Sequence, residues 1–306
     1  MSDLVIAKGP RRLGQSDLHV APIAYGMWRY AGTDVPTAAA KAQAALDAGM
    51  TLFDTADVYG LDSDMHFGAA EELLGEVLAA TPGLRHKIVL ASKGGIIPGT
   101  PYESSADYLR AACEASLTRL KTDVIDLYQV HRPDVLTHPA ELADTLMALR
   151  TEGKIREFGL SNVTASQIAA LQAHLDHPLA TQQPELSAIA IEPVSNGVLD
   201  ACMATAMTPL AWSPLAGGRL MLDAGEASTT QLADVITALN KIARTHATTR
   251  TAAALAFVLA HPSAPIPIIG SQTPARVAEA MSALDITLSR TEWYSVYEAA
   301  LGQPLP

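Results

Sequence analysis

The chain has 306 residues, 49% of them hydrophobic, and its mean hydropathy is slightly positive. This composition is too apolar for a disordered protein and is sufficient for a large core. The formal net charge of −11 and the sequence pI of about 5.2 argue against nucleic acid or an anionic membrane as the main partner, so an anionic ligand would need a local cationic pocket.

No segment of the sequence predicts export or membrane insertion. Residues 1–12 lack the basic-then-apolar pattern of a signal peptide. The longest clearly apolar run, 252–260, is far below the roughly 20 residues that span a bilayer. Cys113 and Cys202 each lie in an Ala-rich segment of helical pattern, which favours two buried thiols in a reducing compartment over a disulfide. We therefore expect a soluble, cytoplasmic protein.

Along the chain, one unit recurs after a small N-terminal hairpin predicted from the alternation over residues 13–20. The unit is a short apolar strand, a polar or Gly-rich loop and an amphipathic helix. The predicted strands are 23–25, 51–54, 88–92, 124–130, 158–160, 180–183, 209–212 and 266–269. The predicted helices, with apolar residues three and four positions apart, include 37–48, 70–79, 106–120, 139–150, 164–174 and 232–246.

Several residues fit the ends of these helices. Ser105 precedes the helix 106–120, and Thr164 with Gln167 resembles a capping box. The interval between the last two strands is longer than the others and predicts a second helix, 249–259. Ser289 is the expected cap of an extra C-terminal helix over 290–301.

Eight strands that alternate with helices predict an α/β protein, a (β/α)8 TIM barrel closed by right-handed crossovers. No Gly/Ser-rich linker interrupts the series, so a single domain over residues 1–306 is expected. A doubly wound sheet is the alternative fold. However, no G-x-G-x-x-G follows any early strand, which removes the usual cofactor signature of that fold.

Polar residues follow the predicted strands at their C-terminal ends, where the chemistry of such barrels gathers. Asp54 at the mouth of an apolar strand requires a cation, and Lys93 after the next strand is its natural partner. The same ammonium beside Tyr59 is expected to lower the pKa of the phenol. His131 follows the fourth strand and can donate a hydrogen bond to a substrate oxygen. A phenol whose pKa is adjusted in this way can donate the proton that carbonyl reduction requires.

With these residues in order, the sequence resembles the aldo-keto reductase superfamily, in its bacterial oxidoreductase-like branch, over nearly the whole chain. The segment 54–60, Asp-Thr-Ala-Asp-Val-Tyr-Gly, is similar to the aspartate-to-tyrosine motif of that family. The resemblance implies that Tyr59 is the general acid, that Lys93 and Asp54 tune it, and that His131 orients the carbonyl. It also implies an extended NADPH bound without a Rossmann domain.

The resemblance assigns further residues to the cofactor. Ser161, Asn162 and Gln183 match the groups that hold the nicotinamide carboxamide, and Trp212 matches the aromatic ring on which the nicotinamide stacks. The segment 213–220 is similar to the loop that crosses the pyrophosphate, and its assigned contacts are Ser213, Pro214, Leu215, Gly217, Gly218 and Arg219. Gly26 and Trp28, after the first strand, complete this part of the site.

The segment 269–276 is similar to the adenosine 2′-phosphate site of the family, with assigned contacts from Gly270, Ser271, Gln272, Thr273, Arg276 and Glu279. Thr273 is expected to cap a helix that begins at Pro274, whose N-terminus favours anions. Arg276, one turn into that helix, can bind a phosphate with two N–H groups.

The sequence departs from the family at two of these positions. Many members have a basic residue where Gly270 stands, and many have Asn after the Glu, where Ala280 follows Glu279. NADP(H) is therefore the favoured cofactor and NAD(H) is possible.

Substrate contacts are expected from Trp28, Arg29 and Tyr30 after the first strand and from Ile96 and Ile97. Packing at the rim is the alternative for the first three. The mostly apolar rim favours a small or medium-sized aldehyde or ketone. The remaining histidines show no metal-ligand spacing, so no metal is predicted.

Two other functions stay open from the sequence. The first is a cofactor-sensing redox regulatory or binding protein, because some relatives of the family act as such subunits. The second is a lyase on the same barrel that uses Lys93 as a Schiff-base nucleophile. The purely structural alternatives are an ion pair for Asp54 with Lys93, core packing for Tyr59, His131 or Trp212, and a solvated helix charge for Arg276. Because Gln182 precedes Gln183, a shift of one residue in the assignment of Gln183 is a further alternative.

Overall fold

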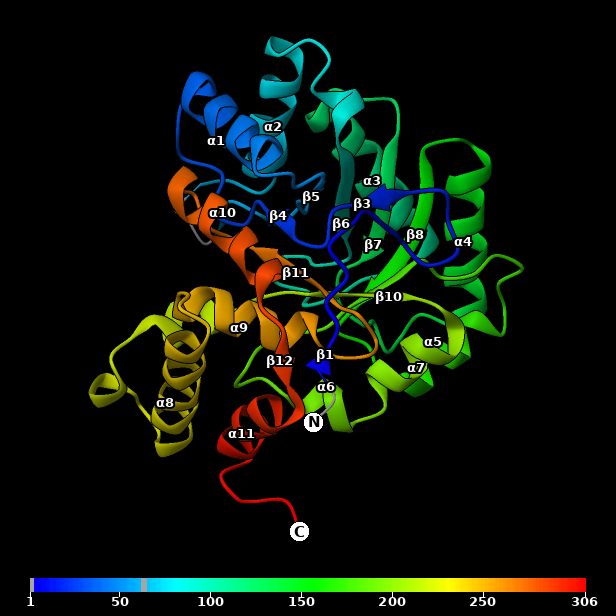
Figure 1. Cartoon of the computed structure of the whole chain (residues 1–306). Coiled ribbons are helices and arrows are strands. Elements are labelled where there is room, and N and C mark those ends of the chain that lie inside the picture. Colours follow the sequence, from blue (N-terminus) through cyan, green and yellow to red (C-terminus); the bar gives the residue numbers. More distant parts are fainter. Residues whose placement is uncertain (1–2, 62–64) are drawn as a thin grey trace.

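The computed structural model describes residues 3–61 and 65–306. Eight parallel strands close into a barrel in the order β10-β11-β4-β5-β6-β7-β8-β9, with helices around it (Figure 1). The barrel strands are β4 (Ala24–Gly26), β5 (Leu52–Asp54), β6 (Val89–Gly94), β7 (Ile125–Val130), β8 (Ile155–Ser161), β9 (Thr181–Gln183), β10 (Thr208–Ala211) and β11 (Ile266–Ile269). Each strand pairs with its neighbours in chain order, so the predicted (β/α)8 TIM barrel is confirmed.

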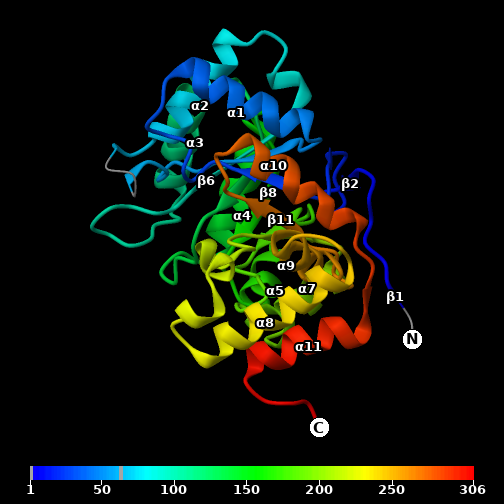
Figure 2. The same cartoon turned by 60° about the vertical axis from the view of Figure 1, so that its left-hand side comes forward.

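The predicted helices are present within about three residues of their expected ends. They are α1 (Val35–Asp47), α2 (Ala69–Ala80), α3 (Ala106–Leu120), α4 (Pro139–Thr151), α5 (Ala165–Gln172), α8 (Thr230–Thr245), α9 (Arg250–Leu259), α10 (Pro274–Ala280) and α11 (Arg290–Leu301). The last helix lies against α8 in both views of the molecule (Figures 1 and 2).

The helix caps are confirmed at two of the positions named from the sequence. Thr164 with Gln167 forms a capping box at α5, and Ser289 with Glu292 forms one at α11. Ser105 occupies the N-cap position of α3 but makes no capping hydrogen bond, because its Oγ donates to a Glu103 carboxylate oxygen at 2.7 Å.

Some elements were not predicted. The helices α6 (Glu192–Ser195) and α7 (Val198–Thr205) lie between β9 and β10, and β1 (Asp3–Leu4) pairs with β12 (Leu288–Ser289). Short 3-10 helices are η2 (Arg85–Lys87), η3 (Ala216–Met221), η4 (Ala224–Glu226) and η5 (Met281–Asp285). The N-terminal hairpin exists, but its strands are β2 (Arg11–Arg12) and β3 (His19–Val20), so the first begins before the predicted segment.

The strand β8 begins three residues earlier than predicted, at Ile155 rather than Phe158. Charged residues conceal this start, because Arg156 and Glu157 are untypical of a buried sheet. Both have partners in the fold. Arg156 binds a carboxylate oxygen of Asp126 at 3.1 Å, and Glu157 binds His177 at 2.7 Å.

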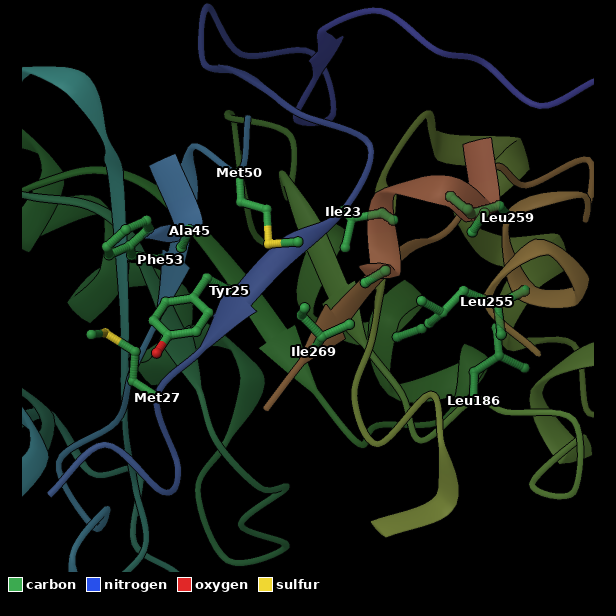
Figure 3. Packing of buried hydrophobic residues seen from close by; sticks show 14 of the residues in the cluster. Ile23, Tyr25, Met27, Ala45, Met50, Phe53, Leu186, Leu255, Leu259 and Ile269 are labelled. Carbon is green, nitrogen blue, oxygen red and sulfur yellow. The ribbon is translucent and has the colours of Figure 1, made fainter. Parts of the chain in front are cut away.

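Two apolar layers hold the barrel. Between the strands and the surrounding helices, Tyr25 packs edge-on against Phe53, with ring centroids 5.4 Å apart, in the layer shown in Figure 3. Inside the barrel, Leu13, Leu18 and Val20 of the hairpin segment join a second buried cluster with strand residues. The N-terminal end of the barrel is therefore filled with apolar side chains, and the polar residues at the C-terminal ends of the strands are left around one open end.

Candidate active site

Lys93 lies at the centre of a buried polar cluster. Its Nζ donates to Asp54 Oδ2 at 2.6 Å, to the backbone oxygen of Thr55 at 2.9 Å and to Tyr59 Oη at 3.2 Å. The lysine side chain is fully buried and Asp54 is 2% exposed. An ammonium has three N–H groups, and all three have partners here. The pairing expected between Asp54 and Lys93 is therefore present, with Tyr59 on the same ammonium.

The loop that carries Tyr59 is fixed to the neighbouring strand. The backbone N–H of Thr55 donates to Ala91 O at 2.9 Å, and that of Asp57 donates to Lys93 O at 3.0 Å. Gly60 closes the loop with a φ of 129°, and a Cβ at that position would come within 2.6 Å of His66 O. Only glycine fits both this backbone conformation and this contact. The loop thus places Tyr59 above the end of β6.

Burial governs the acidity of Tyr59. It raises the pKa of the phenol, and the nearby charge of Lys93 lowers it only in part, while Asp54 raises it further. Lys93 lowers the pKa of Tyr59, as predicted, but by less than burial raises it. The expectation of a net lowered pKa is therefore wrong for the protein without cofactor. Burial most strongly lowers the pKa of Lys93, but Asp54 and Tyr59 together raise it, so the ammonium stays charged.

His131 stands beside Tyr59 at the end of β7. Its backbone N–H donates to Gly94 O at 2.9 Å, and its ring meets that of Tyr59 edge-on with centroids 5.8 Å apart. Burial, Lys93 and Arg132 hold the pKa of the imidazole well below its usual range. The ring is therefore neutral at neutral pH and carries one N–H that can donate to a substrate oxygen.

Two glutamine amides hold the other oxygen of Asp54. Gln183 Nε2 donates to Asp54 Oδ1 at 3.1 Å, and Gln129 Nε2 approaches the same atom at 3.4 Å. Gln183 was predicted to hold the nicotinamide carboxamide, and the bond to Asp54 leaves its Oε1 and its second N–H for such a contact. Gln129 was not predicted, and its only signal is a polar residue inside an apolar strand.

Ser161, Asn162 and Trp212 form a connected chain. Ser161 Oγ donates to Gln183 O at 2.9 Å, Asn162 Nδ2 donates to Ser161 Oγ at 2.7 Å, and Trp212 Nε1 donates to Asn162 Oδ1 at 2.8 Å. Asn162 has a φ of 57°, a left-handed conformation that asparagine tolerates better than most residues. These bonds fix the indole of Trp212 at the edge of the barrel mouth.

A cavity of about 660 Å³ connects these residues to the segments assigned to a cofactor. The predicted residues that line it are Gly26, Trp28, Arg29, Asp54, Tyr59, Ile96, His131, Ser161, Asn162, Gln183, Trp212, Ser213, Pro214, Leu215, Gly217, Gly218, Gly270, Ser271, Arg276 and Glu279. Its volume lies within the range of sites for small organic ligands. Tyr59 and Arg276 both line it, and its donor set fits an extended dinucleotide.

The remaining predicted site residues lie outside this lining. Tyr30 is fully buried, and its hydroxyl donates to Ala38 O at 2.8 Å. Arg219 turns back to its own loop, where Nε donates to Ala216 O at 3.0 Å. Ile97 and Thr273 do not line the cavity. Arg132, by contrast, lines it and was not predicted, because an arginine after a strand resembles an ordinary solvated charge.

In the segment assigned to the 2′-phosphate, Gly270 borders open space and the side-chain amide nitrogen of Gln272 is buried. Gly270 has no atom within 4 Å of where a Cβ would stand, so a larger side chain would fit there. Gln272 turns inward: its Oε1 accepts from Tyr25 Oη at 3.2 Å, and its Nε2 is buried with no partner among the described residues. The helix α10 begins at Pro274 as predicted, with Thr273 in the N-cap position but without a capping hydrogen bond.

Other features expected from the sequence concern metals, cysteines and membranes. Within the described residues, no cluster of three or more histidine, cysteine or acidic side chains could hold a metal ion. Cys113 and Cys202 are both buried and free. Over residues 3–61 and 65–306, no helix combines the length and the apolar character needed to cross a membrane.

The chain is similar to known proteins over nearly its whole length. The sequence profile of the Aldo/keto reductase family matches residues 22–300. The chain is 50% identical to the 6-dehydroglucose reductase of Novosphingobium aromaticivorans over 308 aligned residues, which cover 100% of both chains. It is 34% identical to the 6-dehydroglucose reductase of Agrobacterium fabrum, with 96% of this chain and 99% of the relative covered.

A solved structure shares the fold. It is a thermostable aldo-keto reductase crystallised with the inhibitor epalrestat, and it superposes with a TM-score of 0.81. The alignment covers 95% of this chain and 99% of the other, at 24% sequence identity. At that identity the likeness concerns the barrel and its added elements alone.

Proposed function

The chain belongs to the Aldo/keto reductase family, and from this premise we propose that it interconverts a carbonyl compound and an alcohol with NADP as the favoured cofactor and Tyr59 as the proton donor. It is an NAD(P)H-dependent oxidoreductase of that family. The observation that carries the proposal is the hydrogen-bonded series from Asp54 through Lys93 to Tyr59, which ends in the same cavity as His131 and the residues assigned to the dinucleotide. We further propose that residues 1–306 form a single barrel domain and that the protein is cytoplasmic.

Each residue at the barrel mouth has a separate role in the proposed reduction. The reduced nicotinamide, when bound, supplies the hydride. Neutral His131 donates a hydrogen bond to the carbonyl oxygen and orients it, and Tyr59 Oη holds the proton that the developing alkoxide takes. The ammonium of Lys93 stabilises the phenolate that remains, and Asp54 keeps that ammonium charged. Ser161 and Asn162 are assigned to the nicotinamide carboxamide and Trp212 to its ring.

For the substrate, we propose the aldehyde that names two of the relatives, 6-dehydroglucose. Reduction of its C6 aldehyde would give a primary alcohol. The test is to mix the protein with 6-dehydroglucose and with a panel of simple aldehydes, ketones and alcohols, and to follow the absorbance of reduced nicotinamide with NADPH and with NADH. Turnover on none of them, with cofactor bound, would contradict the proposal and would favour the cofactor-sensing alternative.

The Schiff-base alternative conflicts with the state of Lys93. A nucleophilic amine must be neutral and reachable by the substrate. The Lys93 ammonium is fully buried, is held charged by Asp54, and has each of its N–H groups bound. Borohydride should therefore trap no adduct on Lys93 in the presence of a carbonyl substrate.

The raised pKa of Tyr59 sets the pH dependence of each direction. Reduction needs the protonated phenol, which persists through neutral pH because burial raises its pKa above the ordinary value. We therefore expect the single-turnover rate of reduction to stay flat between about pH 6 and 9, and the rate of alcohol oxidation, which needs the phenolate, to rise roughly tenfold per pH unit. Stopped-flow traces in both directions measure this. A reduction rate that falls by half near neutral pH would assign the proton to another group.

Arg276 is expected to discriminate between the two cofactors. Replacing Arg276 with Ala should raise the Kd for NADPH roughly 10- to 100-fold, because charge-assisted bonds to the 2′-phosphate are lost, and should change the Kd for NADH less than about threefold. Gly270→Lys is the matched gain-of-charge variant, since the open space at Gly270 admits the side chain. It should lower the Kd for NADPH and leave the Kd for NADH unchanged. Quenching of protein fluorescence measures both affinities. An equal loss for NADPH and NADH in the Arg276 variant would refute the phosphate assignment.

A further inference from the structure

The cavity lining includes two arginines that the reaction described above does not use. Arg29 and Arg132 both line the cavity. Among the described residues, neither forms an ion pair or a hydrogen bond to a protein acceptor; each guanidinium instead lies over an indole, that of Arg29 at 5.3 Å from the ring centroid of Trp28 and that of Arg132 at 5.7 Å from that of Trp212. Their N–H groups are therefore available to a ligand.

Arg132 is the one of the two that lies next to the reacting groups. It follows His131 directly, and its charge lowers the pKa of Tyr59 and of His131 as well as that of Glu185. The guanidinium itself lies over the ring of Trp212, and like His131 and Tyr59 it lines the cavity. Arg29 is exposed at the rim.

Part of the cavity lining is apolar. Met27, Val58 and Ile96 line the cavity and offer no side-chain oxygen or nitrogen. A ligand pocket typically combines such walls with a few convergent polar groups that fix orientation. Arg132 is a group of that kind that the reaction leaves unassigned, because His131 and Tyr59 are assigned to the carbonyl oxygen.

The shape of a guanidinium favours a particular ligand. It is a planar fork of N–H donors with no acceptor, and it binds two oxygen atoms side by side. Adjacent hydroxyl oxygens of a polyhydroxylated chain or ring provide such a pair. Trp28 lines the same cavity and is half-exposed, so it adds an aromatic surface that suits the apolar C–H face of such a molecule.

We propose that Arg132 is the residue that selects polyhydroxylated aldehydes, its guanidinium donating to two adjacent hydroxyl oxygens while the aldehyde lies between Tyr59 and His131. This inference rests on the proposed carbonyl reduction at the same site and adds the part of the substrate that is recognised. A site built to bind substrate hydroxyls rejects analogues that lack them far more strongly than an apolar pocket rejects an added hydroxyl.

The test compares three aldehydes on matched variants: 6-dehydroglucose, hexanal and succinic semialdehyde, each with saturating NADPH. Arg132→Met keeps the length of the side chain and removes the donors, and Arg132→Lys keeps the charge but loses the fork. The control Arg244→Met removes an equal charge from an exposed position at the end of α8, which does not line the cavity. Far-ultraviolet circular dichroism and NADPH affinity verify that each variant is folded and binds cofactor.

We expect the ratio of kcat/KM for 6-dehydroglucose over hexanal to fall roughly 100-fold in Arg132→Met, mainly through KM, and to fall by a large part of that amount in Arg132→Lys. In Arg244→Met the ratio should stay within about twofold of that of the unmodified protein. An unchanged ratio in both Arg132 variants would overturn the inference. A selective loss on succinic semialdehyde would also overturn it, because the ligand would then be an anion. Absence of turnover on all three aldehydes by the unmodified protein would instead reject the proposed function.

Discussion

Replacing Tyr59 with Phe should reduce the rate of carbonyl reduction by about 10²–10⁴-fold and leave NADPH binding within about twofold of the unmodified protein. The substitution removes only the hydroxyl. The ring keeps its edge-on contact with His131, whose centroid lies 5.8 Å away, and the loop keeps its backbone bonds to β6. A loss confined to the chemical step would therefore reflect the missing proton donor.

The measurement is single-turnover oxidation of bound NADPH by an aldehyde, with cofactor affinity determined separately by fluorescence. Tyr102→Phe is a suitable control, because that tyrosine is 42% exposed and does not line the cavity. It should react as the unmodified protein does. If the Tyr59 variant retained most of its rate with NADPH bound, Tyr59 would not be the acid, and a water molecule held by His131 would become the alternative donor.

The residues around the reacting carbonyl could be predicted from the sequence because strand ends in a barrel converge. Asp54, Lys93 and His131 are far apart in the chain, but each follows a predicted parallel strand, and the fold brings all such positions to one rim. Once the strands are placed, the pairing of Asp54 with Lys93 follows from their charges. The structure places Tyr59 on the same ammonium.

The acidity of Tyr59 and the role of Arg132 could not be predicted in the same way. The pKa of Tyr59 depends on how completely the folded protein excludes water from the phenol, a quantity that the local sequence does not contain. An arginine that follows a strand is usually solvated. That Arg132 lines the cavity depends on the position of the Trp212 indole, which only the folded structure gives. Both properties belong to the tertiary structure.

The sequence pattern also failed to predict two short helices, because turn-forming residues lie within their segment. The segment with α6 and α7 contains Pro193 and Gly197, which are typical of loops. In the structure, Pro193 lies in the first turn of α6, and Gly197 has a φ of 86° at the start of α7. Both residues are therefore at helix beginnings, where proline and glycine are tolerated, and the helices are too short to show a clear apolar period.

Replacing Lys93 with Met should affect stability as well as turnover. The substitution removes one partner of a fully buried ion pair and leaves the Asp54 carboxylate with only the amides of Gln129 and Gln183. Breaking such a pair typically costs about 3–5 kcal/mol of unfolding free energy, because an uncompensated charge remains buried. The phenol would also lose the cation that stabilises its anion, so carbonyl reduction should become undetectable or nearly so.

The double variant Lys93→Met with Asp54→Asn separates these two effects. An amide at position 54 carries no charge and can still meet the two glutamines, so urea unfolding should show most of the lost stability restored. The reduction rate should stay as low as in the single variant, because the missing ammonium cannot be replaced by a neutral side chain. If stability and rate recovered together, the lysine would act only through the fold. If the single variant were as stable as the unmodified protein, the buried pair of Lys93 with Asp54 would not stabilise the fold.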